Sequence, residues 1–185
     1  MANALTLGRI LLIIPFVAVF LADAAWNMKA ALAIFLIAAL SDFLDGYLAR
    51  ARNEVSALGA ALDPLADKLL VAAALILLTH NGVIHGLGVI AVLIIVLREI
   101  LVSGLRETMA ARGEPLVVTT LAKWKTLLQL AAAALLLAAA PGGFVTAGAA
   151  RSIGTGLLWA SAVLTFFTGA DYALKSARAL RRAGG

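Results

Sequence analysis

The chain contains six apolar segments, each roughly 20 residues long, and this succession constrains its fold more than any other feature. The segments cover residues 8–23, 30–48, 62–79, 86–105, 119–140 and 152–173. A helix of about 20 apolar residues spans the hydrocarbon core of a bilayer. Short breaks at 80–85 and 141–143 predict tight turns. We therefore predict an all-α integral membrane protein with six transmembrane helices, formed as a single domain over residues 1–185.

The composition supports this prediction over two alternatives. Hydrophobic residues make up 63% of the chain and the mean hydropathy is +1.03, whereas a soluble domain is about half apolar. A soluble helical bundle would need polar stripes, which are almost missing from 88–97 and 127–140. The first segment could be a signal peptide, because Ala22-Asp23-Ala24 resembles a cleavage site. It is also long enough to span, and we expect it to be retained.

The charged residues predict the orientation and exclude several functions. With a cytoplasmic N-terminus, 13 of the 15 Lys and Arg residues lie at cytoplasmic ends, and only Lys29 and Arg151 lie on the other side. The positive-inside rule then places both termini in the cytoplasm. The net charge of +5 is not gathered in one basic block, so no nucleic-acid partner is expected. The chain has no cysteine and only two histidines, which excludes thiolate chemistry and disfavours a histidine-rich metal site.

Two pairs of aspartates occur at helical spacing near the cytoplasmic face. Asp42 and Asp45 are three residues apart, and Asp63 and Asp67 are four apart, so each pair shares one face of its helix. Consecutive helices joined by a short turn are natural antiparallel neighbours, so the two acidic faces can meet. Charges inside a bilayer need partners or a wet cavity. Solvated charges at helix ends would explain any one aspartate, but not two matched pairs.

The chemistry of four carboxylates indicates a metal site. Two divalent cations would neutralise four negative charges, and hard oxygen ligands suit Mg²⁺ or Mn²⁺. Such a pair can bridge a diphosphate and orient an in-line attack. Gly46 and Ala49 have the small side chains needed where a ligand approaches a helix closely, and Arg50 can contact a phosphate.

These residues form the string D-x2-D-G-x2-A-R-x8-G-x3-D-x3-D, from Asp42 to Asp67. It resembles the signature of the CDP-alcohol phosphotransferase family at every fixed position. The resemblance implies six transmembrane helices, a homodimer and a polar cavity that faces the cytosol. It also implies a two-metal site lined by the four aspartates, with Asp67 as the general base. The same resemblance places the CDP moiety beside a set of small and polar residues: Gly46, Ala49, Arg50, Gly59, Asn3 and Thr6.

Other stretches are similar to phosphatidylglycerophosphate synthases within that family. They are Arg98-Glu99-Ile100 with 103–107, and Lys123-x-Lys125-Thr126 with Gln129. Two departures are Ala122, where glycine is frequent, and Ala2, where proline is usual before Asn3. The acceptor of such a synthase is glycerol 3-phosphate, a dianion that needs cations beside the metals. We predict that Arg106, Lys123 and Lys125 bind its phosphate, although positive-inside topology alone could also explain them.

The predicted reaction transfers the phosphatidyl group of CDP-diacylglycerol to glycerol 3-phosphate. Other acceptors within the same family stay open: inositol phosphate, serine or phosphatidylglycerol. A cation-coupled transporter is a remote alternative, because transporters often show inverted repeats and midplane sites, which this sequence does not. The sequence shows no evident targeting peptide, so we expect a multi-pass protein of a bacterial inner membrane, surrounded by membrane lipids, with its active site toward the cytoplasm.

Overall fold

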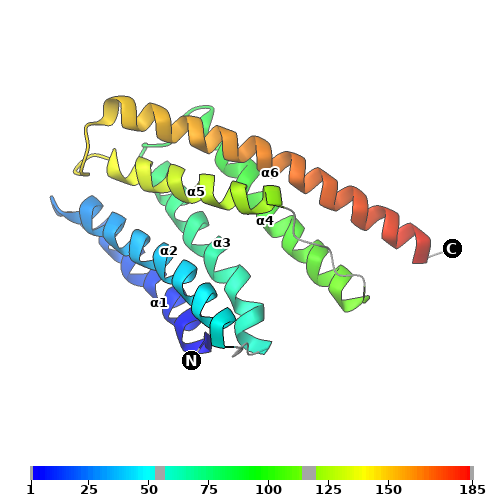
Figure 1. Ribbon diagram of the computed structural model, residues 1–185. Coiled ribbons are helices and arrows are strands. Elements are labelled where there is room, and N and C mark those ends of the chain that lie inside the picture. Colours follow the sequence, from blue (N-terminus) through cyan, green and yellow to red (C-terminus); the bar gives the residue numbers. More distant parts are fainter. Residues whose placement is uncertain (1, 53–56, 114–119, 184–185) are drawn as a thin grey trace.

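The computed structural model describes residues 2–52, 57–113 and 120–183, and all of its regular structure is helical. Side chains are described for 8–41, 68–113, 121 and 124–179, and only the helical backbone is described for the others. Six helices follow one another (Figure 1). They are α1 (Ala2–Leu21), α2 (Asn27–Arg52), α3 (Ala57–His80), α4 (Gly88–Ala111), α5 (Thr120–Ala138) and α6 (Ala147–Ala183).

The helices pack in two groups of three. The first group is α1, α2 and α3, the second is α4, α5 and α6, and α5 also packs against α2 and α3 (Figure 1). Buried aromatic and aliphatic side chains fill the interior, as where the rings of Phe16 and Phe35 lie 6.1 Å apart. The two groups are closest near the turns at one end and diverge toward the opposite ends of α3 and α4.

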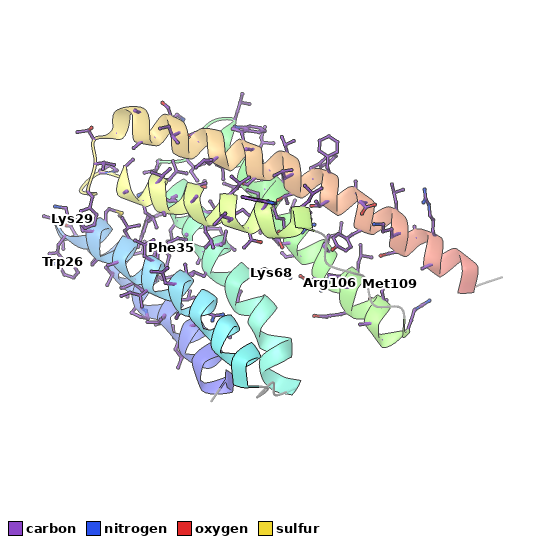
Figure 2. The ribbon with its side chains drawn as sticks, viewed as in Figure 1. Trp26, Lys29, Phe35, Lys68, Arg106 and Met109 are labelled. Atoms are coloured by element: carbon purple, nitrogen blue, oxygen red, sulfur yellow. The ribbon has the colours of Figure 1, made fainter. Side chains whose placement is uncertain are left out.

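Three helix-connecting turns lie together at one end of the molecule. The Lys29 ammonium group, at the start of α2, lies 5.7 Å from the ring centroid of Phe144, which precedes α6. The Arg151 guanidinium on α6 donates to the Val83 carbonyl oxygen, at 2.7 Å, in the α3–α4 turn. Figure 2 shows Trp26 and Lys29 at this end, and Lys68 and Arg106 well away from it. The only two basic residues predicted to lie off the cytoplasmic side, Lys29 and Arg151, therefore lie at the same end.

The helices agree with the predicted segments in number and order but extend past several of their ends. α2 begins at Asn27, whose side-chain amide donates to the Ala22 carbonyl oxygen at 2.7 Å and ties down the preceding turn. α6 continues ten residues beyond 173, and in the described part of this extension Ser176 is buried whereas Lys175 and Arg178 are exposed. Hydropathy marks the apolar part of a helix, not its polar continuation.

The outer faces of the helices are apolar, as expected of a membrane protein. Large side chains such as Ile14, Ile37, Leu97, Ile100 and Phe167 are each more than half exposed. Within the described residues, α4 and the 147–179 part of α6 are long and apolar enough to cross a membrane, with mean hydropathies of 2.3 and 1.4. Four shorter apolar stretches occur in the other helices: Gly8–Leu21, Asn27–Ser41, Lys68–His80 and Trp124–Ala138.

Candidate active site

The aspartate motif occupies two helix ends that are joined by a short connection. Asp42 and Asp45 lie in the second half of α2, and Asp63 and Asp67 lie in the first half of α3. The two helices pack against each other on either side of residues 53–56. The backbones of the two halves of the motif therefore lie on adjoining parts of α2 and α3. The side chains of the four aspartates lie outside the described part of the structure.

Several other predicted site residues also have no described side chain. Their backbones lie in α1, α2, α3 and α5. These residues are Asn3, Thr6, Gly46, Ala49, Arg50, Gly59 and Lys123. Among the described side chains, no group of three or more His, Asp or Glu residues could hold a metal ion. The four carboxylates on adjoining helix ends have the hard oxygen chemistry that Mg²⁺ or Mn²⁺ requires, so this donor set fits the pair of cations.

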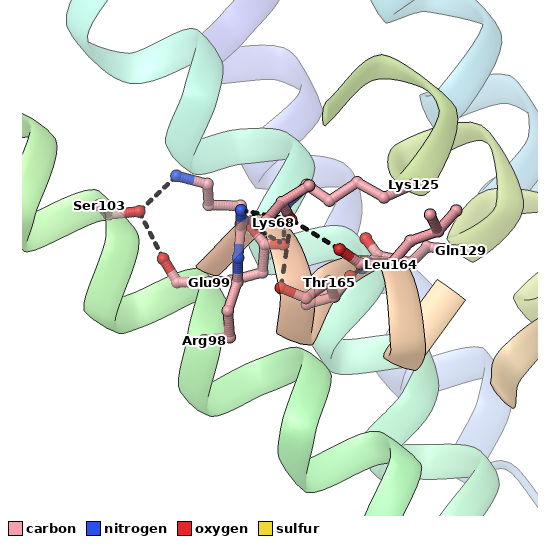
Figure 3. A network of polar contacts seen from close by, with 9 residues as sticks. Lys68, Arg98, Glu99, Ser103, Lys125, Gln129, Leu164 and Thr165 are labelled. Atoms are coloured by element: carbon pink, nitrogen blue, oxygen red, sulfur yellow. Dashed lines mark hydrogen bonds and ion pairs between the residues drawn. The ribbon is translucent and has the colours of Figure 1, made fainter. Parts of the chain in front are cut away.

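A network of charged and polar side chains links α3, α4, α5 and α6 (Figure 3). Its member on α3 is Lys68, the residue that follows Asp67 in the chain. Glu99 of α4 is the centre of this network. One carboxylate oxygen of Glu99 accepts from the Lys125 ammonium group on α5 and, at 3.3 Å, from Nη1 of the neighbouring Arg98. The side chains of Arg98 and Lys125 are 8% and 6% exposed, and that of Glu99 is 14% exposed. Charges this deeply buried between apolar helices need such partners.

Lys68 joins the same network from α3. Its ammonium group donates to the hydroxyl of Ser103, which itself donates to the Glu99 backbone carbonyl at 2.6 Å. Ser103 lies one helical turn after Glu99, so the two residues share one face of α4 (Figure 3). This contact ties Lys68, the residue that follows Asp67 in the chain, to α4.

Arg98 is fixed from the opposite side by α6. Its Nη2 donates to the Thr168 hydroxyl at 2.9 Å, and its guanidinium carbon lies 5.8 Å from the ring centroid of Tyr172. Between them, Gly169 leaves the space that the Arg98 stem fills, because a β-carbon at 169 would lie 2.6 Å from Cγ of Arg98. The absence of a side chain at 169 therefore decides where this arginine can lie.

A second, neutral layer supports the charged one. The Gln129 amide of α5 donates to the Thr165 hydroxyl of α6 at 3.2 Å, and both residues are buried. Gln129 follows Lys125 by one helical turn, so the same face of α5 carries both. The pair holds α5 against α6 at the level of the charged network.

The predicted acceptor residues are only partly described. Lys125 of α5 is buried and paired with Glu99. Arg106 is half-buried, lies two helical turns after Glu99 on α4 and interacts electrostatically with Lys68. The predicted set did not include Glu99, Lys68 or Thr168. Glu99 carried a signal, because it interrupts an apolar segment and lies one turn from Ser103. Thr168 carried none, since a threonine in an apolar helix most often bonds to its own backbone.

Comparisons with known proteins agree with the motif. The family model for CDP-alcohol phosphatidyltransferases matches residues 1–167. A protein of Cereibacter sphaeroides is 38% identical over 94% of this chain and 94% of its own length. Proteins of Rickettsia bellii and Shigella flexneri are 38% and 40% identical over 92% and 95% of this chain, and 91% and 93% of their own lengths. All three carry the name CDP-diacylglycerol–glycerol-3-phosphate 3-phosphatidyltransferase.

Proposed function

Because this chain belongs to the CDP-alcohol phosphatidyltransferase family, we propose that it transfers the phosphatidyl group of CDP-diacylglycerol to glycerol 3-phosphate. The observation that carries this proposal is the set of relatives with that named activity, which match more than nine-tenths of the chain at 38–40% identity. The intact aspartate motif from Asp42 to Asp67 supplies the chemistry. The products are phosphatidylglycerol phosphate, which stays in the bilayer, and CMP.

The four aspartates are proposed to hold two divalent cations. The family generally depends on divalent cations, and Asp42, Asp45, Asp63 and Asp67 form a donor set suited to Mg²⁺ or Mn²⁺. When bound, such cations would stabilise the negative charge that develops on the diphosphate.

We propose that Asp67 of the same motif is the general base of the reaction. Asp67 takes the proton from the 1-hydroxyl of glycerol 3-phosphate, and that oxygen attacks the phosphorus joined to diacylglycerol. The bond from this phosphorus to the oxygen of the CMP phosphate breaks, and CMP leaves with the bonding electrons. The proton on Asp67 then passes to solvent. The residues proposed to border the CDP moiety are Gly46, Ala49, Arg50, Gly59, Asn3 and Thr6.

The acceptor phosphate is assigned to Arg106, Lys123 and Lys125. An electrostatic argument supports the described part of this assignment: among the described side chains, Lys125 and Arg106 belong to a group in which cations outnumber carboxylates. A phosphate monoester carries close to two negative charges at neutral pH and would be attracted there. Serine and neutral alcohols would not need this excess of positive charge.

The proposed topology has six spans with both termini in the cytoplasm of a bacterium and the active site at the cytoplasmic face. Two features support it: the three turns that meet at one end, and the two isolated basic residues, Lys29 and Arg151, that lie there. The whole chain, 1–185, would then be one membrane domain in the inner membrane, surrounded by lipid. We further propose that it assembles as a homodimer, which the mass of the purified protein in detergent would test.

The acceptor site is tested by comparing acceptors and basic-residue variants. We expect CMP release from CDP-diacylglycerol with glycerol 3-phosphate and not with inositol phosphate, serine or phosphatidylglycerol. Arg106→Ala or Lys123→Ala should raise the KM for glycerol 3-phosphate without changing the KM for CDP-diacylglycerol. Lys175→Ala is the control, because Lys175 is an exposed cation paired with Asp171 on α6. An unchanged KM in both site variants would reject the assignment.

A further inference from the structure

The charged network contains one carboxylate whose role the proposed reaction does not explain. Glu99 contributes no predicted metal ligand, base or phosphate contact, yet it is held at the centre of the network by two buried cations. A buried ion pair is weak evidence for stability, because desolvation of both charges offsets their attraction. The contacts around Glu99 indicate a role other than stability.

The position of the Lys125 ammonium group depends on a partner from another helix. A lysine side chain is a flexible stem with a single charged end, and it has about 2 kcal/mol of rotamer entropy to lose. Lys125 reaches across from α5 to α4, where the Glu99 carboxylate accepts its hydrogen bond. Among the described residues, this is the only hydrogen bond or ion pair that the Lys125 ammonium group makes. The location of this ammonium group is thus set by Glu99.

Glu99 is itself held in place by contacts to its carboxylate and to its backbone carbonyl. Arg98 shares the same carboxylate oxygen, and Thr168, Tyr172 and the bare backbone of Gly169 fix Arg98 against α6. The Glu99 backbone carbonyl also accepts from Ser103. Glu99 therefore transfers the rigid geometry of the α4–α6 contact to a mobile side chain of α5.

The charged network has a net positive charge among the described side chains. Among the described side chains, the cations that interact electrostatically here are Lys68, Arg98, Arg106 and Lys125, and the carboxylates are Glu99 and Glu107, so the cations are in excess by two positive charges. Glu99 therefore reduces the repulsion among the cations but does not neutralise them. The remaining excess matches the charge of a dianionic phosphate. The carboxylate can hold the cations together without cancelling their attraction for the substrate.

We propose that Glu99 is a positioning residue of the acceptor site, which fixes the Lys125 ammonium group beside Arg98 and so determines where the phosphate of glycerol 3-phosphate binds. This inference rests on the proposed function, since it names a residue that acts on the acceptor through Lys125. It does not make Glu99 a ligand of the acceptor, because two anions would repel.

The test is a double-mutant cycle in steady-state kinetics with purified protein. Glu99→Gln keeps the size of the side chain and removes its charge, and a misplacement of about 1 Å can reduce function by up to roughly 100-fold. We expect Glu99→Gln to raise the KM for glycerol 3-phosphate by about 10-fold or more and to leave the KM for CDP-diacylglycerol within about twofold. In a Lys125→Met background the same change should add less than about twofold, because the residue through which it acts is gone.

The control is Asp171→Asn, which removes the carboxylate of an exposed ion pair and should leave both KM values unchanged. Where Glu99→Gln does not yield folded protein, Glu99→Asp keeps the charge but withdraws it by one methylene group, and it must still raise the KM for glycerol 3-phosphate several-fold. Equal KM values in the wild-type protein and the Glu99 variant would overturn the inference, as would full additivity with Lys125→Met. Wild-type protein that releases CMP only with an uncharged alcohol would instead reject the proposed function, and the inference with it.

Discussion

A methyl group added at position 169 should displace Arg98 and impair acceptor binding. In Gly169→Ala the new β-carbon would lie 2.6 Å from Cγ and 3.1 Å from Nε of Arg98. Carbon atoms in contact prefer about 3.5–4.0 Å, so the arginine stem or α6 must move by roughly 1 Å. Arg98 resists this movement, because its Nη2 is bonded to the Thr168 hydroxyl at 2.9 Å and its guanidinium lies against Tyr172.

The expected cost has two parts that can be measured separately. Overpacking of a buried contact costs about 1–3 kcal/mol of stability, which a lower midpoint of thermal unfolding in detergent would report. Displacement of Arg98 by about 1 Å should also move Glu99 and Lys125, and we expect a rise of about 10-fold in the KM for glycerol 3-phosphate. The KM for CDP-diacylglycerol should stay the same.

Two other glycines of α6 provide matched controls. In Gly154→Ala the β-carbon would lie 2.9 Å from Cγ of Leu136, so this variant should lose a similar stability but keep its KM for the acceptor. In Gly156→Ala the β-carbon would meet no atom within 4 Å, and the change should be neutral or slightly stabilising. If Gly169→Ala and Gly154→Ala affect the acceptor KM equally, Arg98 does not control the acceptor site and the reasoning fails.

Three further predictions concern the second layer, the opposite end and the metals. Thr165→Val removes the buried partner of the Gln129 amide and should cost about 0.6–1.7 kcal/mol of stability, measured by thermal unfolding, whereas Thr165→Ser should cost less; equal losses would argue against the hydrogen bond. Arg151→Leu removes the bonds to the Val83 carbonyl and should lower the thermal midpoint while kcat and KM stay unchanged, and an altered KM would contradict its placement far from the site. Chelation of divalent cations should abolish CMP release, and Mg²⁺ or Mn²⁺ should restore it; activity that persists in excess chelator would reject the metal site.

The helical architecture could be predicted because it depends on local patterns. Each apolar segment reports one helix, and the Asp42–Asp67 string reports two adjoining helix ends, since both are encoded within a few turns. The helix ends were less predictable. Asn27 begins α2 through a side-chain contact with the preceding turn, and α6 continues past its apolar segment with Ser176 buried, neither of which periodicity shows.

The charged network was only partly predictable for the same reason. From the sequence, Lys125 and Arg106 were predicted to bind the acceptor, but the carboxylate that pairs with Lys125 was not predicted. The pairing of Glu99 with Lys125 joins residues 26 positions apart, and that of Arg98 with Thr168 joins residues 70 apart. Such contacts depend on how α4, α5 and α6 pack. The role of Gly169 is equally hidden in the sequence, because it consists of the space left for a side chain from another helix.

The most direct test of the proposed reaction follows the acceptor into the product. Purified protein would be given CDP-diacylglycerol, isotopically labelled glycerol 3-phosphate and Mg²⁺ or Mn²⁺, and both CMP and labelled lipid would be quantified. We expect one labelled phosphatidylglycerol phosphate for each CMP released, and no product from Asp67→Asn protein of the same fold and stability. CMP released without incorporation of label, or full activity in the Asp67→Asn variant, would contradict it.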